Sequence, residues 1–424
     1  MAGEWQEIAI GELAEISDGL HATPAKTRGG PEFLGISNLV GGRLDLSQTE
    51  HLSEEDYERW TRRVTPTAKD VVFSYETRIG QAAFIPSGLR CCLGRRMGLL
   101  RARPGRVDAR FLLYAYLGPQ FQETLRARTV HGSTVDRIPL IDMPGFPICV
   151  PRDMDEQRAI AHILGTLDDK IELNRRMNET LEEMARALFH SWFVRFDPVR
   201  AKAEGRDPGL PQPLADMFPD AFEESELGEI PRGWKVDTLG DHTINFDSRR
   251  VPLSGTDRAK RQGPYPYHGA AGVLDHLDDY LFDGIYLLVG EDGSVVQGDG
   301  KAVTQYVWGK LWVNNHAHVL QGKDRVSTEQ LYLYFGYQPV APYVTGAVQP
   351  KLSQGRMNAM PFVSASADIC RAFAQLVQPC FAGLRANADA SETLAALRDT
   401  LLPKLISGEL RVKDAERFVG DVCP

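Results

Sequence analysis

The chain has 424 residues, of which 43% are hydrophobic and 25% charged, and its formal net charge is −9. This length allows two or three domains, and the hydrophobic content argues against wholesale disorder. The N-terminal sequence lacks the features of a secretory signal, and no run reaches the ~18 apolar residues of a membrane span. Six cysteines without CxxC spacing predict reduced thiols in a cytoplasmic protein that has no membrane partner.

The acidic balance is mildly unfavourable for a free-standing nucleic-acid-binding protein, whose binding domain is usually basic. It is compatible with basic residues confined to one surface, or with a subunit of a larger assembly. Two segments are locally basic and could supply phosphate contacts. They contain Arg90, Arg95, Arg96, Arg101, Arg103, Arg106 and Arg110, and then Arg249, Arg250, Arg258, Lys260 and Arg261.

Residues 1–150 are predicted to form a first α+β domain, with strands near 70–75 and 81–86 and a helix near 109–118. Residues 151–197 predict a long amphipathic helix. A Pro- and Gly-rich linker follows at 198–229, and its apolar residues indicate that it packs along another part of the protein.

Residues 230–362 predict a second α+β domain, with strands near 285–290 and 302–313 and a helix near 327–338. A second long helix is predicted at 363–408, followed by a C-terminal tail at 409–424. The chain therefore reads as a duplication, because Trp5 and Gly11 correspond to Trp234 and Gly240. The centre of the second domain is about 15 residues shorter, so a shared scaffold is expected to carry different recognition surfaces.

Both long helices carry apolar residues at the four-three spacing of a heptad seam, with polar residues at corresponding places. Polar seam residues fix register and partner, so the helices are predicted to pair with each other as an antiparallel coiled coil. A helical hairpin in a large core and a homodimerisation zipper are the alternatives. The seam positions are Ile160, Leu164, Leu167, Ile171, Asn174, Asn178, Leu181, Leu188, Phe373, Val377, Leu384, Asn387, Leu394 and Leu401.

The sequence contains no catalytic signature. It has no Walker A loop, GxGxxG, HExxH or GxSxG pattern, and it lacks the Pro-Pro-aromatic pattern of amino-methyltransferases. His316 and His318 alternate on a predicted strand and could share one face near the acidic residues at 291–292. A metal-dependent nuclease would show more acidic and histidine clustering, so a structural or DNA-contacting role is favoured over a metal site.

Three segments carry a family resemblance: PRDMDEQRAIAHILGTLDDKIELNRRMNETLEEMARALFHSWFVRFDPV (151–199), WVNNHAHVL with VTGAVQPKLSQGRMNAMPF (312–362), and LRDTLLPKLISGELRV (397–412). Through them the chain resembles the specificity subunits of Type I restriction–modification systems over essentially its whole length. The resemblance implies an α+β protein with two similar target-recognition domains separated by an antiparallel coiled coil of two long helices.

The resemblance also implies a non-catalytic subunit. Each domain is expected to read one half of a bipartite site in double-stranded DNA, and the helix pair is expected to set the gap and dock two methyltransferase subunits. The chain itself is expected to bind no cofactor. S-adenosylmethionine for adenine-N6 methylation, ATP and Mg are expected on those subunits and on the restriction (helicase-nuclease) subunits.

Residues expected to contact DNA lie at strand ends or in the loop that closes each repeat. They are Thr77, Arg78 and Arg137 in the first domain, and Arg249, Asn314, Asn315 and Lys351 in the second. Unlike domain centres further predict two unlike half-sites. The open alternatives are the specificity subunit of a related Type II system, a DNA-spacing adaptor or regulator without methyltransferase partners, and a self-sufficient nuclease using His316 and His318.

Overall fold

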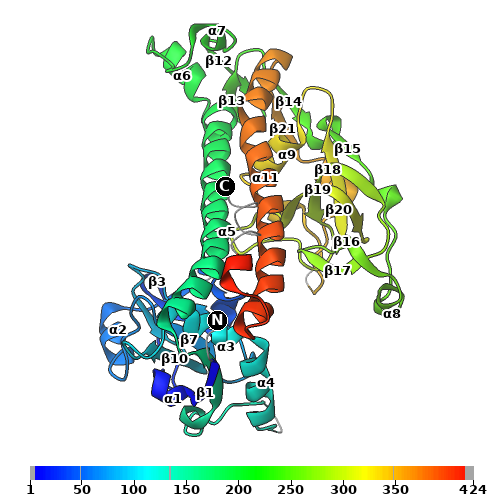
Figure 1. Ribbon diagram of the computed structural model, residues 1–424. Helices are drawn as coiled ribbons and strands as arrows, with labels where there is room; N and C mark the ends of the chain where they lie inside the picture. The colour runs from blue at the N-terminus through cyan, green and yellow to red at the C-terminus, as the bar shows by residue number, and fades with distance from the viewer. Residues whose placement is uncertain (1–4, 48, 133–134, 347, 416–424) are drawn as a thin grey trace. The chain divides into compact units, whose positions relative to one another are not determined.

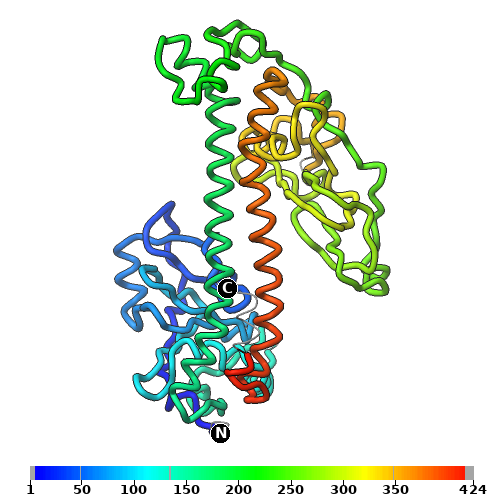
Figure 2. The backbone as a smooth tube through the Cα atoms, turned by 45° about the horizontal axis from the view of Figure 1, so that its top comes forward, coloured from blue at the N-terminus to red at the C-terminus, as the bar shows by residue number. Residues whose placement is uncertain are grey.

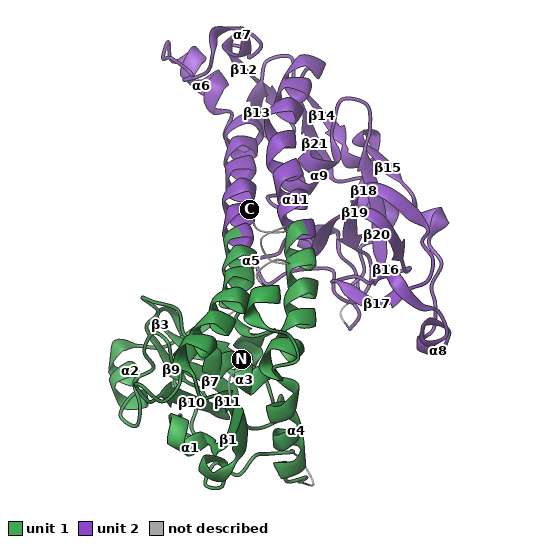
Figure 3. Cartoon of the chain, viewed as in Figure 1, with its two compact units in different colours: residues 1–173, 390–424 green, residues 174–389 purple. Residues whose placement is uncertain are grey.

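Helix α5 (Met154–Phe189) and helix α11 (Ala367–Ile406) are the two long helices of the chain (Figure 1 and Figure 2). The computed structural model describes residues 5–47, 49–132, 135–346 and 348–415. The chain divides into two units, residues 1–173 with 390–424 and residues 174–389, and each unit contains part of both long helices (Figure 3). Residues 1–4 of the predicted first domain and 416–424 of the predicted tail, with Cys423, lie outside the described residues.

The first unit contains a four-stranded antiparallel sheet in the order β2-β10-β7-β8 and a three-stranded sheet in the order β6-β3-β9. The first sheet consists of β2 (Ala14–Asp18), β10 (Met97–Ala102), β7 (Val71–Ser74) and β8 (Ala82–Phe84), and the second of β6 (Glu50–His51), β3 (Thr27–Leu34) and β9 (Cys91–Leu93). The other elements are β1 (Trp5–Ala9), α1 (Ile10–Leu13), β4 (Leu39–Val40), β5 (Arg43–Leu44), α2 (Glu54–Trp60), α3 (Ala109–Leu117), α4 (Pro119–Arg128) and β11 (Pro147–Pro151).

Helix α3 lies at the centre of the core of the first unit. Asp108 caps its N-terminus by accepting hydrogen bonds from the backbone nitrogens of Arg110 (3.0 Å) and Phe111 (2.9 Å). Residues 111–116 are all buried, which is expected of a helix covered on every side. The same core includes side chains of β7 and β10 and the parts of α5 and α11 in this unit. The long helices are therefore part of the domain core.

The second unit is built on a six-stranded sheet in the order β15-β20-β18-β19-β16-β17. Its strands are β15 (Thr243–Asn245), β20 (Ala317–Gly322), β18 (Phe282–Gly290), β19 (Thr304–Val313), β16 (Gln262–His268) and β17 (Val273–Leu277). The other elements are α6 (Asp197–Ala203), α7 (Gln212–Ala215), β12 (Phe222–Ser225), β13 (Gly228–Pro231), β14 (Lys235–Thr238), α8 (Gly255–Ala259), α9 (Thr328–Phe335), α10 (Gln354–Asn358) and β21 (Pro361–Ser364).

The two units share one topology, which confirms the predicted duplication and the α+β class. Strands β2, β10 and β7 pair in the same order and sense as β15, β20 and β18. Strand β9 is parallel to β3, as β19 is parallel to β16. Strand β1 pairs with β11 in the register Gln6 to Val150, and β14 pairs with β21 in the register Lys235 to Ser364. These two registers coincide when the repeats are aligned.

Helices α5 and α11 pack against each other within each unit, as the predicted coiled coil requires. In the second unit, Asn174 Nδ2 donates to the carbonyl oxygen of Asn387 (3.3 Å) and Asn178 Nδ2 to that of Leu384 (3.2 Å). Partner numbers in α11 fall as those in α5 rise, so the pairing is antiparallel. No helix in the described part of the chain is long and apolar enough to cross a membrane.

Most of the predicted seam side chains are shielded from solvent. The buried ones are Ile160, Leu164, Leu167, Ile171, Asn174, Phe373, Val377, Leu394 and Leu401, and the half-buried ones are Asn178, Leu181, Leu188, Leu384 and Asn387. In the first unit, the half-buried Arg398 donates to Asp168 (2.8 Å), and Tyr114 donates to the same carboxylate (2.6 Å). Arg398 therefore occupies an apolar seam position without leaving its charge unpaired.

The asparagine layer gives a double-mutant test. Asn387 Nδ2 donates to Asn178 Oδ1 (2.9 Å), so Asn387→Leu is expected to cost about 1–3 kcal/mol of unfolding free energy by removing a donor from a half-buried amide. Replacing both residues with leucine is expected to recover most of that loss, since the seam becomes apolar on both sides. Urea unfolding of the two variants checks the pair. Equal losses in the single and double variants would contradict the coupling.

The predicted linker at 198–229 contains α6, α7, β12 and the first residues of β13. It packs on the C-terminal end of α5, where Phe218 is buried and its ring lies 4.8 Å from that of Trp192. Helix α5 ends in a π-helical turn at His190–Val194, and Phe196 adopts a left-handed backbone conformation (φ 56°) before α6 begins. Several apolar residues of the linker, including Val199 and Phe218, thus belong to the core of the second unit, while Met217 is exposed.

Candidate nucleic-acid interface

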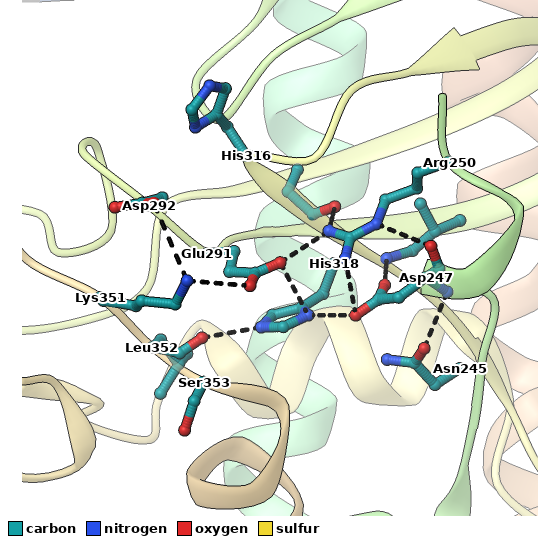
Figure 4. Close-up of polar contacts among 12 residues, drawn as sticks. Asn245, Asp247, Arg250, Glu291, Asp292, His316, His318, Lys351, Leu352 and Ser353 are labelled. Atoms are coloured by element: carbon teal, nitrogen blue, oxygen red, sulfur yellow. Dashed lines mark hydrogen bonds and ion pairs between the residues drawn. The ribbon is translucent and has the colours of Figure 1, made fainter. Parts of the chain in front are cut away.

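The loop after β18 gathers several predicted DNA-contacting residues of the second domain. Asp292 forms a backbone bridge with Lys351, whose Nζ lies 3.6 Å from Glu291 Oε1 and 3.9 Å from Asp292 Oδ2 (Figure 4). The turn 314–316 joins β19 to β20, and Glu291 N donates to the carbonyl oxygen of His316 (2.8 Å). Lys351 and this turn therefore lie at the same end of the sheet.

A cavity of 440 Å³ lies beside this loop. Its polar wall includes Asp292, Asn314, His316 and Gln349, and its apolar wall is residues 270–274. Asn314 is buried, and its Oδ1 accepts a hydrogen bond from His316 N (2.8 Å). Asn315 is exposed at the tip of the turn. Amide side chains of this kind can read base edges, in particular those of adenine.

Beneath the loop, four ionisable side chains form a largely buried network (Figure 4). Arg250 Nη1 lies 2.7 Å from Glu291 Oε2, and Arg250 Nη2 lies 3.4 Å from Asp247 Oδ2. His318 Nδ1 lies 2.5 Å from Asp247 Oδ2, and its Nε2 lies 2.8 Å from the carbonyl oxygen of Leu352. Because both ring nitrogens face oxygen acceptors, both contacts are hydrogen bonds only when each nitrogen carries a proton.

The network stabilises the ionised form of Asp247. Burial acts to raise the pKa of this carboxyl, but hydrogen bonds from His318 and from the Val319 backbone, with the charges of His318 and Arg250, hold the pKa below its ordinary value. The loop after β18 is called the recognition loop below. Glu291 N donates to the 314–316 turn, and Leu352 N donates to Glu291 O (2.9 Å). Through Glu291, the network therefore connects the recognition loop to that turn and to the segment that contains Leu352.

Asp247, Glu291 and His318 also offer three potential metal ligands within 4.8 Å of one another. The guanidinium of Arg250 already pairs with both carboxylates, and it donates a further hydrogen bond to the carbonyl oxygen of Ala317 (2.7 Å). A metal ion would have to displace this held cation. The chemistry of the cluster is therefore that of a structural ion-pair network.

For two members of the network, Arg250 and His318, the sequence pattern singled out a nearby residue of the same type. It chose Arg249, which is exposed, donates to the Leu281 carbonyl oxygen (2.6 Å) and lies over the ring of Phe282 (4.8 Å). It also paired His316 with His318, but His316 lies in the exposed turn and His318 is buried in β20. The expectation that these two histidines share one face was wrong. The i,i+3 spacing of Asp247 and Arg250 was the available signal for the network.

The first unit repeats the loop with the same backbone contacts. Glu76 forms a backbone bridge with Arg137, as Asp292 does with Lys351. Thr77 N donates to the carbonyl oxygen of Asp136 (3.3 Å), and Thr77 has a left-handed backbone (φ 65°), as does Gly293 in the second unit (φ 79°). The three residues predicted to contact DNA in this domain, Thr77, Arg78 and Arg137, are exposed and meet at this loop.

The ion-pair network has no equivalent among the described residues of the first unit. Tyr75 stands where the second unit has Glu291, and Gly98 where it has His318, when the two sheets are aligned by register. Asp18, which aligns with Asp247, pairs instead with Arg63 (3.1 Å). Burial, followed by the charges of Asp18 and Glu76, raises the pKa of Tyr75 to about 12. The two loops thus share one backbone conformation, but different side chains lie beneath them.

The family model described as Type I restriction modification DNA specificity domain matches residues 2–183. The chain is 27% identical to the Type I restriction enzyme MjaIX specificity subunit of Methanocaldococcus jannaschii, over 97% of this chain and 94% of that protein. It is 24% identical to the Type I restriction enzyme HindI specificity subunit of Haemophilus influenzae, over 61% of this chain and 68% of that protein. A crystal structure of the Type-I restriction-modification system S subunit from M. genitalium covers 95% of this chain and 96% of its own, with a TM-score of 0.53 and 18% identity.

Two similar α+β domains, each completed by parts of the same two long helices, define a duplicated fold. The solved relative has this fold over nearly its full length. Over nearly its whole length, the chain is therefore similar to specificity subunits of Type I restriction–modification systems.

Proposed function

We propose that this chain is the non-catalytic DNA specificity subunit of a Type I restriction–modification complex, and that its two domains read the two unlike halves of one bipartite site. The observation that carries this proposal is the duplicated loop. Glu76 with Arg137 and Asp292 with Lys351 occupy matched backbone bridges, so the domains present one frame twice. The side chains around the two frames differ, as two different half-sites require.

Partner subunits supply the chemistry in this proposal. The helix pair docks two methyltransferase subunits that bring S-adenosylmethionine, and restriction subunits bring ATP and Mg. Met177 and Met184 on α5 and Leu376 on α11 are exposed apolar side chains that a docked subunit would cover. The chain contributes DNA recognition and geometry, and no bond-making step.

Methylome sequencing of the source organism tests the proposal. The expected result is adenine methylation at two unlike half-sites separated by a gap of fixed length. A palindromic methylated site would contradict the asymmetry. A methylome without any bipartite site that depends on this gene would favour the spacing adaptor or regulator instead. The genes beside it distinguish a Type I from a Type II assembly.

The helix pair is also proposed to set the gap between the half-sites. Inserting one heptad into both α5 and α11 adds about 10 Å of helix, which corresponds to about 3 base pairs of DNA. The expected methylome shows the same half-sites with a longer gap, and heptad deletion shows a shorter gap. Changed half-site sequences with an unchanged gap would contradict this role of the helices.

A further inference from the structure

The two arginine-rich segments present fewer free positive charges than their sequences indicate, because most of their arginines form ion pairs within the protein. In the first unit, Arg90, Arg96, Arg101, Arg103 and Arg110 pair with Glu54, Glu76, Asp70, Glu15 and Asp169. Among the described residues, only Arg95 and Arg106 of this segment have no ion-pair partner. They lie beyond opposite ends of β10. Arg95 is at the end that carries the recognition loop.

Arg95 occupies the tip of a turn that is equivalent to the 314–316 turn of the second unit. Gly94 N donates to the carbonyl oxygen of Leu34 (2.7 Å), as Asn314 N donates to that of His268 (3.0 Å). On the other side, Tyr75 N donates to Arg96 O (3.3 Å), as Glu291 N donates to His316 O (2.8 Å). In the first unit the turn joins β9, which is parallel to β3, to β10, which pairs with β7. In the second unit it joins β19, which is parallel to β16, to β20, which pairs with β18.

When the two domains are aligned by these hydrogen bonds, Arg95 in the first is equivalent to Asn315 in the second. Both side chains are exposed, and neither makes a hydrogen bond or ion pair with another described residue. Each turn contacts the loop that carries the matched backbone bridge, Glu76 with Arg137 or Asp292 with Lys351. In the first unit, Arg96 Nε also lies 2.9 Å from Glu76 Oε2. The tip residues therefore have a fixed backbone and a free side chain, which is the arrangement that base readout requires.

We propose that Arg95 and Asn315 are paired specificity-determining residues, and that they read a guanine in the half-site of the first domain and an adenine at the corresponding position in that of the second. Arginine forms bidentate hydrogen bonds with O6 and N7 of guanine, and asparagine with N6 and N7 of adenine. The inference rests on the proposed DNA-specificity function and adds the two residues and the two bases. The earlier candidates Arg78 and Arg137 flank the same loop and are suited to phosphate contact.

The test is selection of binding sites by the full-length chain from a library of random-sequence duplex DNA. The wild-type chain is expected to enrich a bipartite site. Arg95→Asn is expected to weaken binding to the wild-type site about 5- to 150-fold and to change one base preference from guanine toward adenine, in the first half-site alone. Arg106→Asn, at the other end of β10, is the matched control and should enrich the wild-type site.

The reciprocal variant Asn315→Arg should change an adenine preference to guanine in the other half-site, so a folding failure of one variant leaves the other decisive. In each variant, the unaltered half-site reports that the rest of the protein is intact. If the wild-type chain enriches no bipartite site, the proposed function itself fails. If it does, and both tip variants enrich the same two half-sites as Arg106→Asn with unchanged affinity, the assignment of Arg95 and Asn315 is overturned.

Discussion

Arg250→Ala is expected to lower the free energy of unfolding of the second unit by about 3–5 kcal/mol. The substitution leaves the carboxylates of Asp247 and Glu291 beside His318 without the guanidinium that pairs with both of them. The side chains of Arg250, Asp247 and Glu291 are only 11%, 10% and 15% exposed, so water cannot replace the lost guanidinium easily. The hydrogen bond to the Ala317 carbonyl oxygen is lost as well.

Because the chain has two units, one global unfolding transition would be hard to assign. Amide hydrogen exchange in increasing denaturant measures the two units separately, and the loss should be confined to the peptides of β15, β18 and β20 with their neighbours. Arg249→Ala is the control, since its exposed guanidinium lies outside the network, and should change stability by less than about 1 kcal/mol. Equal losses for the two alanine variants would contradict the structural role of the network.

The effect of Arg250→Ala should depend on pH in a defined direction. The pKa of Asp247 is lower in the folded chain than in the unfolded one, so its carboxylate contributes stability above the unfolded value of about 3.9. That contribution is lost as the pH falls through the folded pKa. The difference between wild type and variant should therefore be full at pH 7 and shrink below about pH 4. A difference that grows in acid would contradict the ionised state assigned to Asp247.

Phe373→Ala is expected to have the second large effect, a loss of about 3–5 kcal/mol in the second unit. Phe373 is fully buried where α11 meets the C-terminal part of α5, and its ring lies 4.9 Å from that of Phe193, 5.8 Å from Trp192 and 6.0 Å from Phe189. Truncation leaves a cavity among rigid rings that cannot close around it.

Leu376 lies on the same helix and is 46% exposed, so Leu376→Ala is the matched control and should cost less than about 1 kcal/mol. Hydrogen exchange should show the loss for Phe373→Ala in α5, α11 and the linker that packs on them. A loss no larger than that of Leu376→Ala would mean that the aromatic cluster does not hold the helix pair together in this unit.

The sequence predicted the parts of the fold that are determined by local patterns. A four-three apolar spacing and matched asparagines are periodic signals, and the paired helices follow from them. Strands at 70–75 and 302–313 were marked by β-branched and aromatic residues and are present as β7 and β19. The order of the strands within each sheet was not predicted, because it depends on pairings between residues far apart in the chain.

The site was predicted less well for a related reason. Asp247, Glu291 and His318 come from three separate elements, and only the sheet register shows that they meet. Choosing between Arg249 and Arg250, or between His316 and His318, requires knowing which of two nearby side chains points into the core. A strand or a tight turn reverses that direction with a shift of one residue. Charge counts alone also overstated the basic surface, since they do not show which arginines already have carboxylate partners.

The first unit is assembled from two separate stretches of the chain, because residues 390–424 join residues 1–173 and the second unit occupies the interval between them. On the ribosome, every residue of the second unit is therefore available before the first unit can be finished. Leu394, Leu401 and Leu405, which belong to the core of the first unit, are translated after the whole of the second unit. A premature stop codon after residue 389 would thus damage the unit encoded first and spare the sequence of the unit encoded later.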